Sequence, residues 1–67
     1  MDAFKERLKD LREEKELSQR ELAKKLAIGH TSIARWERGD VEPNASSIIM
    51  LALFFDVTAG YLLGLEN

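Results

Sequence analysis

Two short helical segments separated by three residues constrain the fold of this chain more than any other feature. Ser18 precedes a predicted helix and is followed three residues later by Glu21, the spacing of a capping box. In that motif each side chain bonds the backbone N–H of the other residue, so the start of the helix is well defined. Ala27-Ile28-Gly29 interrupts this helix, and a second one is predicted from His30 to Arg38, with Gly39 at the position where helices commonly end. Two helices joined by so short a turn hold each other in a fixed orientation.

The rest of the chain predicts three more helices and no strand. Their candidate N-caps are Asp2, Asn44 and Thr58. In the first, Phe4, Leu8 and Leu11 recur at helical spacing on one face. β-branched residues are few and do not alternate over a useful length, so a sheet is not expected. We therefore expect an all-α fold of five helices in one domain, residues 1–67.

The composition excludes several classes of protein. No cysteine is present, which rules out disulfides and thiolate zinc sites. One histidine and no glycine-rich phosphate loop leave little for catalysis, so we expect no enzyme, cofactor, metal or small-molecule ligand. The longest apolar run, Ile48–Phe55, is far shorter than the roughly 20 residues that cross a bilayer. A cytoplasmic protein that does not enter the membrane is the simplest interpretation.

The predicted helix from His30 to Arg38 has two unlike faces. Ile33 and Trp36 point to one side, with Glu37 close beside them. The opposite side carries two hydroxyls and two guanidinium groups, from Thr31, Ser32, Arg35 and Arg38. The major groove of B-DNA, about 12 Å wide, admits one helix and offers partners for such groups. An ordinary solvated helix face is the alternative interpretation.

The charge of the chain does not by itself suggest a nucleic-acid ligand. The net charge is −2, whereas many DNA-binding domains are basic. All ten Lys and Arg residues, however, lie between Lys5 and Arg38. Because phosphate responds to the local field of a surface, one edge of the domain can still be basic.

The segment Leu17–Gly39, LSQRELAKKLAIGHTSIARWERG, closely resembles the helix-turn-helix of the lambda-repressor-like family, which includes Cro and XRE-type regulators. The similarity extends to Leu11-Arg12 before this segment, and after it to Leu51-Ala52, Val57 and Tyr61-Leu62-Leu63-Gly64. The resemblance implies a five-helix lambda-repressor-like domain, with the helix-turn-helix at 18–38 and C-terminal helices at 44–63. It also implies a nucleoid-associated transcriptional regulator, usually a repressor, that binds an inverted-repeat operator as a homodimer.

Three kinds of residue role follow from the resemblance. The base-reading positions of the family correspond to His30, Thr31 and Arg35, of which Arg35 is expected to read guanine. Positions at or near the phosphate backbone correspond to Gln19, Ser32 and Arg38. Arg12 and Glu37 correspond to a pair that forms a salt bridge inside the protein. For His30, a solvated cap residue is the alternative.

This chain departs from the family pattern near both ends of the 30–38 helix. The following loop is often basic in relatives but reads Asp40-Val41-Glu42 here, which predicts a weaker grip on phosphate. Ala27 stands where many relatives have Gly, which is tolerable if the turn needs no positive φ there. Gly29 provides no side-chain acceptor for an N-cap.

The segment 44–55 carries more apolar surface than the core of one small domain needs. Ile48, Leu51, Ala52 and Phe55 form the expected core face. The remaining apolar residues, with one from the last helix, predict a homodimer interface of Met50, Leu53, Phe54 and Tyr61. One alternative is that the tail Leu63–Asn67 covers them. Another is that the helix at 44–55 docks a different protein, as in an antitoxin or the DNA-binding subunit of a heteromeric complex.

Overall fold

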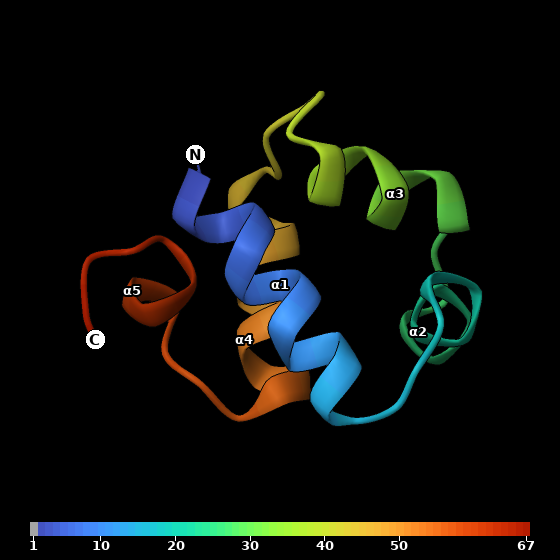
Figure 1. Ribbon diagram of the computed structural model, residues 1–67, viewed down its shortest axis with the longest axis horizontal. Coiled ribbons are helices and arrows are strands. Elements are labelled where there is room, and N and C mark those ends of the chain that lie inside the picture. Colours follow the sequence, from blue (N-terminus) through green and yellow to red (C-terminus); the bar gives the residue numbers. More distant parts are fainter. Residues whose placement is uncertain (1) are drawn as a thin grey trace.

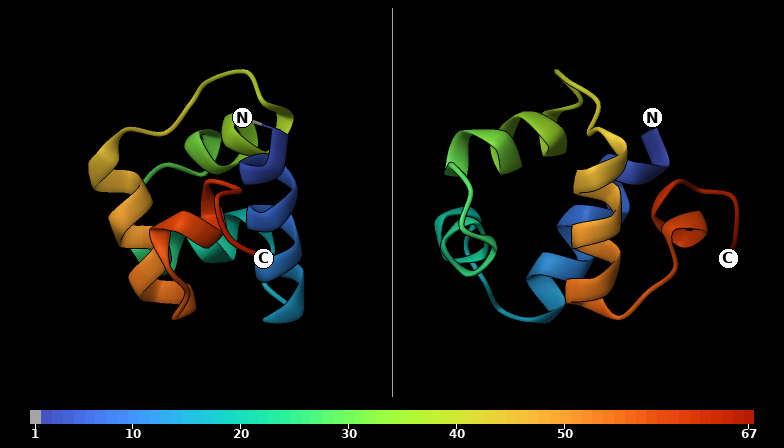
Figure 2. Two further views of the ribbon diagram at one scale, coloured as in Figure 1. Left: turned by 90° about the vertical axis from the view of Figure 1, so that its left-hand side faces the viewer. Right: turned by 180° about the vertical axis from the view of Figure 1, so that it is seen from behind.

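The computed structural model describes residues 2–67 and contains five α-helices and no strand within that range. In chain order they are α1 (Asp2–Glu14), α2 (Gln19–Leu26), α3 (His30–Arg38), α4 (Ala45–Phe55) and α5 (Ala59–Leu62). The predicted all-α, five-helix architecture is therefore confirmed. Figure 1 shows α3 and α2 at the top and right and α5 at the left, with α1 crossing in front of α4. The left view of Figure 2 places α1 and α4 on opposite sides of the molecule.

One apolar core joins all five helices. Its buried residues are Phe4, Leu8, Leu22, Ala23, Ile33, Trp36, Ile48, Leu51, Ala52, Phe55 and Leu62. Phe4 and Trp36 meet edge to face with ring centroids 6.4 Å apart, which ties α1 to α3. Leu11, which was expected on the buried face of α1, packs against the core while partly exposed, and so does Leu26 on α2. The apolar spacings read from the sequence thus correctly predicted the buried faces of α1, α3 and α4.

Side-chain caps fix the starts of three helices. The Ser18, Asn44 and Thr58 side chains accept hydrogen bonds from the backbone N–H of the residue three positions later, at 2.8–3.0 Å. At α1, Asp2 is the first helical residue, and the predicted cap by its side chain lies outside the described residues, as does Met1. The last helix ends at Leu62, and Gly64 at φ +81° follows it in the left-handed conformation.

Candidate nucleic-acid interface

The capping box sets the position of α2 and of its first residue, Gln19. Ser18 Oγ accepts from the Glu21 backbone N–H at 3.0 Å, and Glu21 Oε1 accepts from the Ser18 N–H at 2.8 Å. The bonds from Ser18 lower the pKa of Glu21, because they stabilise its ionised form. The predicted capping box is confirmed, and it fixes the N-terminus of α2 beside α3.

The turn between α2 and α3 contains a strained residue. Ala27 has φ +58° and ψ +41°, the left-handed conformation that favours glycine. Its N–H bonds the Lys24 carbonyl, and the Ile28 N–H bonds the Ala23 carbonyl at 3.0 Å, so the conformation closes α2. The turn therefore requires a positive φ at position 27. Alanine was expected to be tolerable there only without a positive φ, so Ala27 is strained.

The faces of α3 separate as the sequence predicted. Ile33 and Trp36 are buried, at 0% and 7% exposure. His30, Thr31, Arg35 and Arg38 are exposed, and Ser32 is partly exposed. We call Thr31, Ser32, Arg35 and Arg38 the α3 polar face. It presents hydroxyl and guanidinium donors over the length of one short helix, which suits base edges and phosphate oxygens.

Behind the α3 polar face, a nearly buried ion pair joins α1 to α3. Arg12 Nε donates to Glu37 Oε2 at 2.7 Å and Arg12 Nη2 donates to Glu37 Oε1 at 2.9 Å, a two-pronged contact. Their side chains are only 11% and 5% exposed. A third donor, Arg12 Nη1, bonds the Leu17 carbonyl at 2.8 Å. The hydrogen bonds to Glu37 raise the pKa of Arg12, so the guanidinium stays charged and the pair holds α3 against α1.

Gln19 also bonds this ion pair. Its side-chain Nε2 donates to Glu37 Oε1 at 3.1 Å, which links the first residue of α2 to the end of α3. An amide nitrogen carries two hydrogens, so this bond uses one donor and leaves the other for a second acceptor. No pattern in the sequence predicts the Gln19–Glu37 contact, because the two residues are 18 positions apart and meet only through the turn.

At the other end of α3, Arg38 has a partner on the protein. Its Nε donates to Asp40 Oδ2 at 2.8 Å, and the two side chains are 59% and 53% exposed. Gly39 adopts φ +80°, and the Asp40 N–H bonds the Arg35 carbonyl at 3.0 Å, so the chain folds back over the helix end. Asp40, from the acidic loop that predicts a weaker grip on phosphate, is thus paired with Arg38, a predicted phosphate contact.

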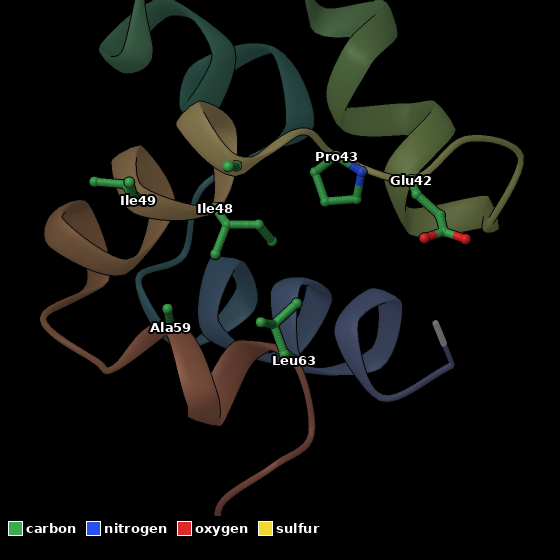
Figure 3. A pocket seen from close by; sticks show the side chains of 7 residues that line it. Glu42, Pro43, Ile48, Ile49, Ala59 and Leu63 are labelled. Atoms are coloured by element: carbon green, nitrogen blue, oxygen red, sulfur yellow. The ribbon is translucent and has the colours of Figure 1, made fainter.

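The outer side of α4 is apolar and open to solvent. Leu53 is 77% exposed and Ile49 is 57% exposed. We call Ile49, Met50, Leu53 and Phe54 the α4 apolar face. Beside it lies an open groove between the loop before α4, α4 itself and α5 (Figure 3), lined by Glu42, Pro43, Ala45, Ile48, Ile49, Ala59 and Leu63. In this view Ile48 points towards the other helices and Ile49 points away from them.

The four residues predicted for a dimer interface differ in how they are placed. Phe54 packs against the core, with the Phe55 ring centroid 5.0 Å away and the Lys15 ammonium 5.6 Å from its ring. Tyr61 lies under the guanidinium of Arg7 at 4.2 Å. Met50, Phe54 and Tyr61 are therefore partly covered, while Leu53 is freely accessible. Sequence reasoning missed Ile49, although its spacing of four from Leu53 places both on one side of a helix.

The C-terminal tail does not cover Leu53. Arg7 Nη1 donates to the carbonyls of Tyr61 and Glu66, and the Thr58 hydroxyl bonds Glu66 Oε1 at 2.9 Å. These contacts hold the tail along α5 and α1, away from the exposed side of α4 (Figure 1). The alternative in which Leu63–Asn67 folds over all of these apolar residues is wrong for Leu53.

Residues 2–67 offer neither a metal cluster nor a membrane-spanning helix. No group of three or more His, Asp or Glu side chains there is placed to hold a metal ion. None of the described helices has the length and apolar character needed to cross a membrane.

Comparison with known proteins agrees with this geometry. The model of the helix-turn-helix family matches residues 8–62. The chain is 41% identical over 96% of its length to the HTH-type transcriptional activator BcrR of Enterococcus faecalis, covering 31% of that protein. It is 34% identical over 91% of its length to the regulator ImmR of Bacillus subtilis, and 36% identical over 87% to the regulator DicA of Escherichia coli. It covers 48% and 43% of those two, so it spans less than half of each of the three relatives. No solved structure gave a significant match.

Proposed function

The chain belongs to the Cro/XRE-type helix-turn-helix family of DNA-binding proteins, and we propose that it regulates transcription by placing α3 in the major groove of a specific operator. The observation that carries this proposal is the exposure of the α3 polar face while Ile33 and Trp36 fix the opposite side in the core. A helix held this rigidly presents the same side chains to every duplex, as sequence reading requires. The family is one of DNA-binding proteins, in line with the expectation that the chain is not an enzyme.

Within this proposal, base reading falls to the N-terminal half and middle of α3. His30, Thr31 and Arg35 are exposed, and their side chains make no hydrogen bond or ion pair with the described residues, so their donors can reach base edges. Arg35 is suited to guanine, because its fork of donors matches the O6 and N7 acceptors. Discrimination at one base position is expected to depend mainly on this residue.

Phosphate contacts are assigned to Gln19, Ser32 and Arg38. Gln19 lies at the N-terminus of α2, where free N–H groups and the helix dipole favour an anion. Its bond to Glu37 orients the amide and leaves one N–H for a phosphate oxygen. These contacts fix the register of α3 on the duplex and carry no sequence information.

A homodimer completes the proposal. Leu53, with Met50, Phe54 and Tyr61 around it, supplies apolar surface that the chain's own tail leaves open, and Ile49 extends that surface. Two copies paired through α4 would present two recognition helices to half-sites about 34 Å apart on an inverted repeat. The same surface suits a different protein partner. The mass of the purified chain in solution separates the two cases, because a homodimer forms without any other protein.

The direction of regulation is also part of the proposal. We assign repression, because a small domain that occupies promoter DNA excludes other proteins from it. One relative, BcrR, is named a transcriptional activator, so a contact with the transcription machinery is the competing outcome. A reporter whose promoter overlaps the operator should fall in expression when the chain is produced.

Selection of bound duplexes from a random pool tests the central proposal. A consensus with two-fold symmetry, bound with an affinity that falls as salt rises, is the expected result. Recovery of no consensus, or retention of duplexes that is independent of salt, would contradict sequence-specific binding through α3.

A further inference from the structure

One carboxylate lies directly on the surface assigned to DNA. Asp40 accepts a hydrogen bond from Arg38 Nε at 2.8 Å, at the end of the α3 polar face. We infer that Asp40 competes with DNA phosphate for Arg38 and thereby lowers the affinity of the domain for all duplexes. The inference rests on the proposed DNA-binding function and identifies a residue that tunes it.

The backbone holds Asp40 in this position. Gly39 at φ +80° reverses the chain, and the Asp40 N–H bonds the Arg35 carbonyl at 3.0 Å. Asp40 therefore belongs to the hydrogen-bonded C-cap of α3 and not to an unrestrained part of the loop. Its placement beside Arg38 follows from the way α3 terminates.

The chemistry of the contact is the same as that of a phosphate contact. A carboxylate and a phosphate oxygen bind a guanidinium through the same planar donors, so the two anions exclude each other at Nε. Because DNA must displace Asp40 to reach Arg38, and the freed carboxylate takes up a cation, contact at Arg38 gives little net release of counterions and adds little to the salt dependence of binding. Both side chains are more than half exposed, so the pair is weak enough for DNA to open it.

The variant Asp40→Asn tests this inference. Asparagine removes the competing charge while keeping the size of the side chain. Each phosphate contact contributes about 0.9 to the slope of log affinity against log salt, which is nearly tenfold in affinity per decade of salt. We expect Asp40→Asn to bind about eightfold more tightly near 0.1 M salt and to steepen the slope by about 0.9. The gain should be equal for the selected duplex and an unrelated one of the same length, because phosphate contacts do not read sequence.

Two further proteins make the test specific. Asp56→Asn removes the same charge from another exposed aspartate, in a left-handed conformation that asparagine also adopts. Asp56 follows α4, whose C-terminal end lies across the molecule from α3 (Figure 1), so this control should leave affinity and slope unchanged. In an Arg38→Gln background, Asp40→Asn should have no effect, because the residue it competes for is gone.

The outcomes are distinct. An unchanged affinity for Asp40→Asn overturns the inference, and so does an equal gain with and without Arg38, which would indicate general repulsion. A gain for the selected duplex alone overturns it too, because it would place Asp40 near a base. If the wild-type chain binds no duplex at any salt, the proposed function has failed before this inference is tested.

Discussion

The outward faces of α3 and α4 belong to consecutive helices and are built in opposite ways. The α3 polar face carries hydroxyl and guanidinium groups, and the helix is held from behind by the ion pair of Arg12 and Glu37. The α4 apolar face carries Leu53 and Ile49 at 77% and 57% exposure, and α4 buries only apolar side chains. Both helices leave surface that the described residues do not cover, but the first suits a polyanion and the second suits another apolar surface.

The difference shows how a domain this small can separate two binding tasks. Apolar packing tolerates small changes in the orientation of α4, because the hydrophobic effect is not directional. Reading bases requires fixed geometry, and the two-pronged hydrogen bonds between Arg12 and Glu37 supply it for α3. We therefore expect changes on α4 to alter assembly and changes around α3 to alter stability and recognition.

Leu53→Lys should give the largest effect. Burying a leucine is worth about 1.5–3 kcal/mol, and in a two-fold dimer the change occurs twice, so association should weaken by about 3–6 kcal/mol. Sedimentation equilibrium should show a monomer, and urea should still unfold it in one cooperative transition. Leu53 suits this test better than Phe54, because Phe54 also packs against the core.

Leu65→Lys is the matched control for that variant. Leu65 is 79% exposed, close to the 77% of Leu53, but lies on the tail. It should leave the mass in solution unchanged. A wild-type chain that sediments as a monomer, or a Leu53→Lys dimer, would show that α4 is not the interface.

Glu37→Ala should have the next largest effect, on the free energy of unfolding. It leaves the Arg12 guanidinium 11% exposed and without its carboxylate, and it removes the acceptor of Gln19. Breaking a buried pair from one side costs about 3 kcal/mol. Urea unfolding should show this loss, whereas Glu42→Ala, an exposed glutamate in the following loop, should change little. Equal effects of the two variants would show that the ion pair does not hold α3.

Arg35→Ala changes the α3 polar face and leaves the ion pair behind it intact. Because Arg35 is exposed, the unfolding midpoint should stay within experimental error. Affinity for the selected duplex should fall by about 1–3 kcal/mol, with preference lost at one base position. Lys9→Ala, an exposed cation on α1, provides the comparison. A uniform loss on all duplexes would make Arg35 a phosphate contact.

Sequence patterns predicted the scaffold well and the contacts around α3 less well. Caps at Ser18, Asn44 and Thr58 depend on neighbours three residues away, so they are readable from the chain. The Gln19–Glu37 bond joins two different helices, so its geometry appears only when they pack. The exposure of Ile49 was missed for a different reason: 48–55 is apolar on every side of the helix, so the spacing of four between Ile49 and Leu53 did not stand out.

Ala27→Gly should stabilise the domain by a smaller amount. Relieving the left-handed conformation of alanine stabilises the folded state by about 1–2 kcal/mol. Glycine is more flexible in the unfolded chain, which lowers the free energy of unfolding by about 0.5–1 kcal/mol. The net gain in the free energy of unfolding is therefore about 0.5–1 kcal/mol. The C-cap of α4, Asp56, has nearly the same φ of +56°. Asp56→Gly should gain less, because a short polar side chain tolerates this conformation better. Equal gains in thermal unfolding would mean that the turn before α3 carries no special strain.

Gly29→Ser should have the smallest effect and completes the comparison of the two helix starts. The side chain of Asn44 accepts from the Ser47 N–H at the start of α4, whereas Gly29 makes no side-chain bond at the start of α3. Gly29 has φ −73° and ψ 140°, as the other caps do, and a Cβ added there would meet no atom within 4 Å. A serine therefore fits without strain, and its hydroxyl should stabilise the domain by a few tenths of a kcal/mol, roughly 0.3 kcal/mol. Gly29→Ala separates this cap from the loss of glycine flexibility, since alanine provides no acceptor and is a poor N-cap. If serine and alanine raise the thermal midpoint equally, the gain comes from reduced flexibility of the unfolded chain. The start of α3 would then be set by packing against the core and not by a side-chain cap.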